Sequence, residues 1–120
     1  MAGNARFIEH KNKRILLIDF SRCELEEIVS IIREAKKLIS MEPPASVLTL
    51  TNVTGTHNNA AVVRVMKDFT TFNRPYVKAA AVVGIEGLTK IVFDAIVKFS
   101  GRTLVAHEDV DKAKDWLVEQ

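Results

Sequence analysis

Side chains that can form hydrogen bonds are concentrated in one stretch of this chain, residues 51–59, with the sequence TNVTGTHNN. A glycine within it permits close approach of a ligand to the backbone. A helix is predicted to begin directly after the stretch, and the unpaired N–H groups at its start would favour an anion. The residues to which we assign ligand or partner binding are Thr54, Gly55, Thr56, His57, Asn58 and Asn59.

The same stretch has a structural interpretation. Thr56 or Asn58 would cap the helix that follows, and capping is expected whether or not a ligand binds. His57 has three interpretations: a hydrogen-bonding surface residue, which is the commonest for a lone histidine, a pH-sensitive switch, or the reactive group of an uncharacterised enzyme.

Other reactive side chains lack the neighbours that chemistry requires. Cys23 follows a predicted helix start, which could lower the pKa of its thiol, but no histidine lies near it in sequence, and inert packing is the preferred interpretation. The sequence Gly84-Ile85-Glu86-Gly87 departs from both nucleotide-binding glycine patterns and is better explained by a tight turn. The histidines lack metal-ligand spacing. We therefore predict no enzyme, no metal and no cofactor.

The first elements can be predicted from short patterns. Apolar runs at residues 6–10 and 14–20 flank the polar sequence KNK, and together they predict a β-hairpin. The second run is almost continuously apolar, as expected of a strand covered on both faces. Ser21 and Glu24 then fit the capping-box pattern S-x-x-E, so a helix is predicted to follow and to extend to Ser40.

Strands and helices alternate along the rest of the chain. Further strands are predicted at residues 47–50, 77–83 and 102–106, and further helices at 61–72, at 86–100 and from a cap at Asp109 through Leu117. The order ββαβαβαβα predicts a single α/β domain over residues 1–120. Its sheet is mostly parallel with an antiparallel N-terminal hairpin strand, and helices pack on it.

The predicted helix at residues 86–100 carries two apolar surfaces. One stripe at i, i+3, i+4 spacing is expected to face the core, whereas Phe93 and Val97 point away from it. The pair either contacts a neighbouring helix, which we prefer, or is exposed. An exposed pair would mark a homodimer interface, a lid over a ligand cavity or a peripheral membrane contact. We include Phe93 and Val97 among the binding residues, on the hypothesis that this helix is mobile.

Composition excludes several classes of protein. With 48% hydrophobic and 27% charged residues, the chain falls in the ordinary globular class. A formal net charge of +2 is too small to predict nucleic-acid binding. The single cysteine agrees with a reducing compartment, and the chain shows no signal peptide and no apolar run long enough to span a membrane. We therefore expect a cytoplasmic protein.

This arrangement resembles the STAS superfamily, named for sulphate transporters and anti-sigma-factor antagonists, and in particular its small stand-alone bacterial members. The resemblance covers most of the chain. It rests on the opening hairpin, the strand Leu48-Thr49-Leu50 and the final helix with Ala113-Lys114-Asp115-Trp116-Leu117. A subgroup that ends in a similar Ala-x-x-Trp-Leu helix resembles lipid-carrier domains. The resemblance implies a non-enzymatic regulatory module that binds a regulatory protein or a small apolar or anionic ligand.

In the signalling members of this superfamily, a serine at the start of the second helix is phosphorylated by a partner kinase. The corresponding motif falls on residues 57–60 here, and Asn58, which cannot be phosphorylated, occupies the position of that serine. Thr54 and Thr56 lie nearby but not at the matching position. The alternative function is therefore an anti-sigma-factor antagonist that is phosphorylated on Thr54 or Thr56.

Overall fold

The computed structural model describes residues 4–56, 59–85 and 104–120. The strands are β1 (Asn4–His10), β2 (Lys13–Asp19), β3 (Val47–Asn52), β4 (Val77–Val83) and β5 (Leu104–His107). The helices are α1 (Leu25–Ile39), α2 (Ala60–Asn73) and α4 (Val110–Val118). The helix predicted at residues 86–100 lies outside the described residues.

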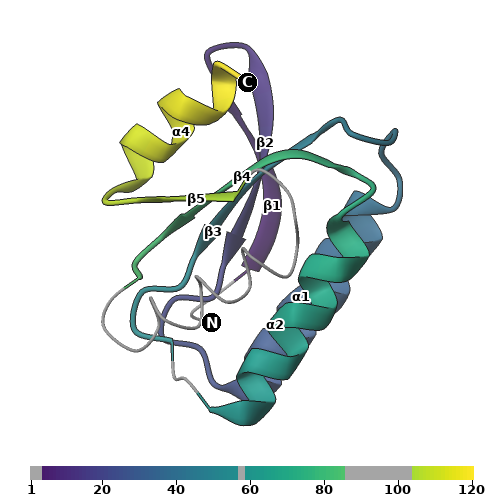
Figure 1. Cartoon of the computed structure of the whole chain (residues 1–120), viewed down its shortest axis with the longest axis vertical. Coiled ribbons are helices and arrows are strands. Elements are labelled where there is room, and N and C mark those ends of the chain that lie inside the picture. Colours follow the sequence, from purple (N-terminus) through teal and green to yellow (C-terminus); the bar gives the residue numbers. More distant parts are fainter. Residues whose placement is uncertain (1–3, 57–58, 86–103) are drawn as a thin grey trace.

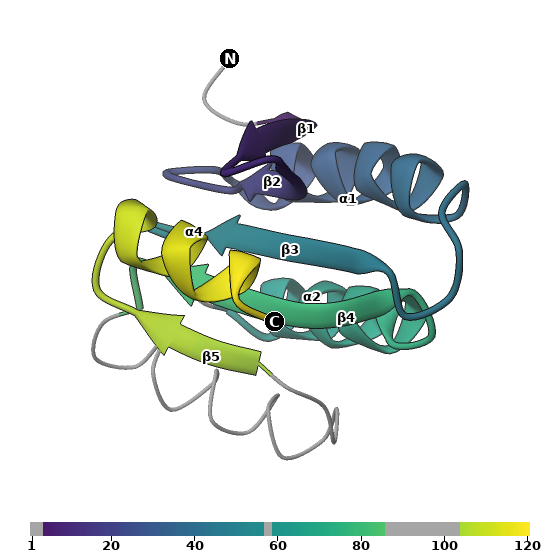
Figure 2. The same cartoon turned by 90° about the horizontal axis from the view of Figure 1, so that it is seen from above.

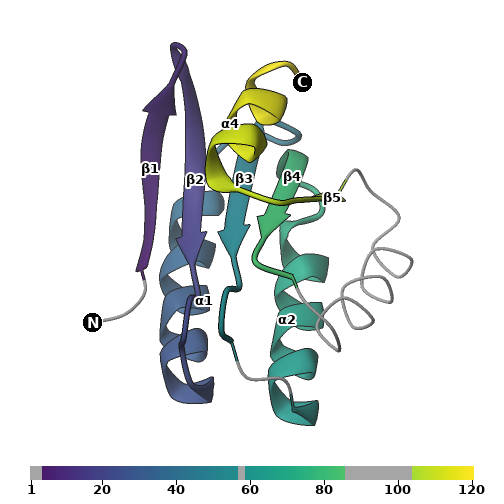
Figure 3. The ribbon, with the colours of Figure 1, turned by 90° about the vertical axis from the view of Figure 1, so that its left-hand side faces the viewer.

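The described strands form one five-stranded sheet in the order β1-β2-β3-β4-β5 (Figure 3). β1 pairs with β2 in antiparallel fashion, and the remaining pairs are parallel. Lys11 and Asn12 form the turn between β1 and β2, and both have a positive φ (50° and 67°), as a two-residue hairpin turn requires. The predicted mixed α/β sheet with an antiparallel edge is thus confirmed.

Helices cover both faces of the sheet (Figure 2). α1 and α2 pack on one face, where Phe20 and Phe69 meet edge to face with their ring centroids 6.4 Å apart. α4 packs on the other face, where Leu117 is fully buried with Leu50. The two faces are covered because alternate residues of the central strands point to opposite sides and are mostly apolar on both, with Thr49 of β3 as a buried exception. This agrees with the continuous apolar runs of the sequence.

The start of α1 differs from the prediction. The N-cap is Glu24 and not Ser21, and the capping box joins Glu24 to Glu27. Ser21 is unsuited to the role because its backbone N–H already donates to Asp19 Oδ1 over 2.9 Å in a turn that ends β2. Arg22 next in the chain has a φ of 56°, so the backbone reverses before the helix begins.

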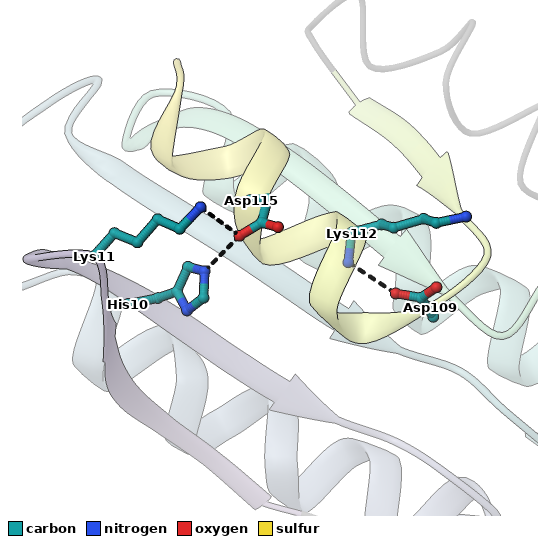
Figure 4. A network of polar contacts seen from close by, with 5 residues as sticks. All are labelled: His10, Lys11, Asp109, Lys112 and Asp115. Atoms are coloured by element: carbon teal, nitrogen blue, oxygen red, sulfur yellow. Dashed lines mark hydrogen bonds and ion pairs between the residues drawn. The ribbon is translucent and has the colours of Figure 1, made fainter.

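α4 is held by polar contacts at both ends (Figure 4). Asp109 caps the helix as predicted, since its carboxylate accepts the backbone N–H of Lys112 over 2.8 Å. Toward the other end, Asp115 Oδ1 lies 2.8 Å from His10 Nε2 and 3.0 Å from Lys11 Nζ. α4 is therefore fixed to the β1–β2 hairpin. No helix within the described ranges is both long and apolar enough to cross a lipid bilayer.

Candidate functional site

The predicted binding loop lies where the parallel strands end (Figure 1). β3 extends to Asn52, two residues further than predicted, so the loop is shorter than the sequence suggested. The segments that follow β2, β3 and β4 meet at this end of the sheet. We call them the carboxyl edge and define it as residues 20–24, 53–56, 59 and 84–85, with His57 and Asn58 outside the described residues.

Hydrogen bonds within the loop make it a tight turn. Asn52 Oδ1 accepts from the backbone N–H of Thr54 over 3.0 Å and from the Thr54 hydroxyl over 2.7 Å. The backbone N–H of Thr56 donates to Val53 O over 3.0 Å. The side chain at the end of β3 therefore fixes the conformation of the loop that follows, in an Asx-type turn.

The loop is also joined to the turn that follows β2. The backbone N–H of Arg22 donates to Thr54 O over 2.8 Å. In the opposite direction the Thr56 hydroxyl donates to Phe20 O, also over 2.8 Å. Because these bonds connect residues more than thirty positions apart in sequence, the two turns form one rigid unit.

Glycines allow the closest contacts at this edge. Gly84 has a φ of +87°, and a Cβ there would lie 2.2 Å from Thr54 Oγ1 and 2.5 Å from Thr54 N. Only glycine fits such an approach of two backbones. The interpretation of Gly84 as a turn glycine is thus confirmed. Gly55 has a φ of +68° and lies against the Arg22 side chain, whose Cγ would be 3.0 Å from an added Cβ.

Thr54, Gly55 and the side chain of Arg22 are exposed at the surface of this unit, whereas Thr56 is half-buried. Arg22 was not among the predicted binding residues. No sequence pattern signals it, since its place beside the loop follows from a positive φ and from a contact with a distant turn. Among the described residues, the carboxyl edge therefore presents the side chains of Arg22 and Thr54 and the open backbone of Gly55, with Glu24 and Asn59 also exposed.

Asn59 caps α2, since its side chain accepts the backbone N–H of Val62 over 3.0 Å. The expectation that Thr56 or Asn58 is the N-cap is therefore wrong. The hydroxyl of Thr56 instead donates a hydrogen bond to Phe20 O. Asn59 thus has a demonstrable structural role, although it is exposed.

The other reactive residues lie apart from the loop surface. Cys23 is fully buried, and burial, with smaller contributions from Glu27 and Asp19, raises the pKa of its thiol, opposite to the effect that a helix start would have. Within the described ranges, no cluster of histidine, cysteine and carboxylate side chains could hold a metal ion. Phe93 and Val97 lie outside the described residues.

His107 is a further residue that the sequence did not single out. Its ring packs against Trp116 with the centroids 5.3 Å apart, and its Nε2 is buried without a hydrogen-bond partner in the part of the chain that the structure describes. His107 ends β5, and its partner in the sheet is Val83.

Comparison of the chain with models of known protein families, with curated proteins and with solved structures finds no significant match.

Proposed function

We propose that this protein is a non-enzymatic, cytoplasmic binding module of the STAS type, which recognises a regulatory protein through its carboxyl edge. A small apolar or anionic ligand at the same place is the second form of this proposal. The support comes from the mixed α/β sheet and from the loop after β3, which in this superfamily leads into the regulatory helix.

One observation carries the proposal: the loop is exposed at Thr54 and Gly55, and yet its backbone is hydrogen-bonded on both sides of Thr54. Thr54 and Gly55 are open to solvent, while the backbone of Thr54 is bonded on one side to Asn52 and on the other to Arg22. A partner that binds a fixed loop does not have to order it first, and the entropic cost of association is lower.

The hydroxyl groups of this surface are poorly placed for catalysis. Thr54 donates to the amide oxygen of Asn52, and Thr56 donates to the peptide carbonyl of Phe20. A nucleophilic hydroxyl needs an adjacent group that accepts its proton, and neither an amide nor a peptide oxygen does so near neutral pH. The geometry of Thr54 and Thr56 therefore favours recognition over covalent chemistry.

Phosphorylation of the loop remains the alternative, and exposure favours Thr54 over Thr56 as the acceptor. The hydroxyl of Thr56 is partly buried beneath the turn after β2, where a kinase could reach it only after the turn opened. A phosphoryl group on Thr54 would replace its bond to Asn52 and would stand beside the turn that carries Arg22. Intact mass after incubation with the cognate kinase tests this alternative, with Thr54→Ala and Thr56→Ala identifying the acceptor.

Site-specific photo-crosslinking in the native cell tests the binding proposal. A photoreactive amino acid is placed at position 54, and a matched protein carries it at position 34, where Glu34 is exposed in the middle of α1. We expect one discrete protein adduct from position 54, none from position 34, and loss of the position-54 adduct when Arg22 is also replaced by Glu. Equal crosslinking from both positions, or no adduct from position 54, would contradict the proposal.

A further inference from the structure

The end of the molecule opposite the carboxyl edge carries an exposed apolar side chain. Met41 is 80% exposed, the highest value among the large hydrophobic residues that the structure describes. It lies between α1 and β3, in residues 40–46. We call this end the amino edge and define it as residues 11–14, 36–46 and 72–78 together with the last turn of α4 (Figure 1).

Met41 is exposed even though the segment that carries it is held in place by hydrogen bonds and an ion pair. The backbone N–H groups of Ala45 and Ser46 donate to Pro75 O and Tyr76 O, each over 2.9 Å. Arg14 Nη1 lies 3.1 Å from Glu42 Oε1, which joins the segment to β2. The segment is thus fixed by α1 before Met41 and by these contacts after it, and the side chain is held in water at a hydrophobic cost.

Several cations lie at this end of the molecule, and most of them form no ion pair within the part of the chain that the structure describes. Within the described ranges, ion pairs at this end neutralise only Arg14 and Lys11. The basic residues that form no ion pair among the described residues are Lys13, Lys36, Lys37, Arg74 and Lys78. The amino edge is therefore positively charged.

Helix dipoles explain part of this charge. α1, α2 and α4 all end here. Lys13 donates to Val118 O, in the last turn of α4, over 2.7 Å, and Lys78 donates to Gln120 O, two residues beyond that helix, over 2.8 Å. Cations are favourable at such ends. The dipoles do not explain an exposed methionine among the cations. Lys36 Nζ also lies 5.0 Å from the centroid of the Phe72 ring, so a cation contacts an aromatic side chain at this end.

We propose that the amino edge docks on an anionic phospholipid bilayer. Met41 enters the boundary between headgroups and acyl chains, and the exposed cations Lys37 and Arg74 contact the phosphate and carboxylate headgroups. The carboxyl edge contains Glu24, and Glu26 and Glu27 lie next to it in the first turn of α1. Repulsion of these three carboxylates from the bilayer fixes the orientation. The loop at Thr54 then faces away from the membrane. This inference does not rest on the proposed function.

Binding of the full chain to vesicles tests the proposal. Vesicles of phosphatidylcholine alone are compared with vesicles that also contain phosphatidylserine, and cosedimentation is measured at low and high salt. We expect binding only to the anionic vesicles, and weaker binding at high salt because the ionic atmosphere screens the headgroups.

Two variants and a matched control locate the surface. Lys37→Gln is expected to weaken binding about fivefold, as the loss of one cation near an anionic bilayer implies. Met41→Ser is expected to weaken it about tenfold through the lost apolar insertion. Arg64→Gln removes an equal charge near the start of α2, toward the carboxyl edge, and is expected to leave binding unchanged. Both substituted side chains at the amino edge are exposed, so the fold is retained.

Several outcomes would overturn the proposal. These are the absence of binding to either kind of vesicle, equal binding to both, or an equal loss in the Arg64→Gln control. If Lys37→Gln weakens binding and Met41→Ser does not, the surface recognises negative charge without entering lipid. The insertion of Met41 into the bilayer, on which the proposal depends, would then be wrong.

Discussion

The carboxyl and amino edges are built in different ways. At the carboxyl edge, backbone meets backbone: Gly84 lies against Thr54, and the turn containing Arg22 is bonded to it. At the amino edge, the groups that meet solvent are the ends of long side chains, such as Lys37 and Met41, on segments fixed beneath them. The carboxyl edge therefore presents a fixed backbone shape, whereas the amino edge presents positive charge and an apolar side chain. Substitutions at the carboxyl edge should therefore lower the stability of the fold, whereas substitutions at the amino edge should weaken only the binding to vesicles.

The largest effect is expected at Gly84. In Gly84→Ala, the new Cβ would collide with the backbone N and the hydroxyl of Thr54 and would also occupy a left-handed backbone conformation. We expect the free energy of unfolding to fall by about 2–4 kcal/mol, from overpacking together with backbone strain. Urea denaturation followed by circular dichroism measures the change.

Gly55→Ala is the matched control for this prediction. Its φ is also positive, but the added Cβ would lie closest to the flexible side chain of Arg22, at 3.0 Å, and the nearest backbone atoms would be at an ordinary contact distance of 3.9 Å. A loss of about 1 kcal/mol is expected from the conformation alone. If the two variants lost equal stability, the close approach of Gly84 to Thr54 would not be the cause.

A smaller fall in the free energy of unfolding is expected when the N-cap of α2 is removed. Asn59→Ala leaves the backbone N–H of Val62 without its side-chain acceptor and should cost about 1 kcal/mol. Asn59→Asp keeps an acceptor and should retain nearly full stability. Thermal unfolding of the two variants checks this pair, and a neutral Asn59→Ala would show that the cap contributes nothing.

At the amino edge, Met41→Ser should change the free energy of unfolding by less than about 0.5 kcal/mol, because the side chain is largely in water before the substitution. The measurement is again the urea midpoint. A loss comparable with that of Gly84→Ala would show that Met41 is part of the core and would remove the contrast between the two edges.

The smallest effect on stability is expected from protonation of Asp115 at low pH. Hydrogen bonds from His10 and Lys11 lower the pKa of Asp115 below its usual range. Because the pKa is lower in the folded state than in the unfolded one, the stabilisation is complete above the unfolded value of about 4 and is lost as pH falls through the folded value. The effect is small since the carboxylate is exposed.

Melting temperatures of the wild type and Asp115→Asn, measured from neutral to acidic pH, check this prediction. We expect a small advantage of the wild type at neutral pH, which disappears in acid. A difference that grew as the pH fell would contradict the assigned contacts of Asp115.

Local patterns predicted much of the architecture. The bounds of β4 (Val77–Val83) agree with the prediction, because a run of small apolar residues between a proline and a glycine allows few alternatives. The cap at Asp109 was also predicted correctly, since its carboxylate accepts the backbone N–H of Lys112, a residue of the same turn. The order of strands and helices follows from the same kind of short-range signal.

The details of the candidate site depend on contacts that no local pattern contains. Thr56 resembles a helix cap in sequence, but its hydroxyl bonds to Phe20, 36 positions away. The capping box at Ser21 failed because Asp19 already accepts the backbone N–H of that residue and the chain turns at Arg22. The contact between Gly84 and Thr54 joins two different strand ends. Such features become visible only when the strands are placed side by side.

Amide hydrogen exchange of the free protein tests most directly whether the carboxyl edge is a preformed surface. The N–H groups of Arg22, Val53, Thr54 and Thr56 each have an acceptor in the structure, although Thr54 lies in an exposed loop. We predict that these four amides exchange at least about a hundredfold more slowly than in an unstructured peptide. Exchange of the Thr54 and Thr56 amides at the unstructured rate would mean that the loop is not held in place, and the basis for assigning it a binding function would be lost.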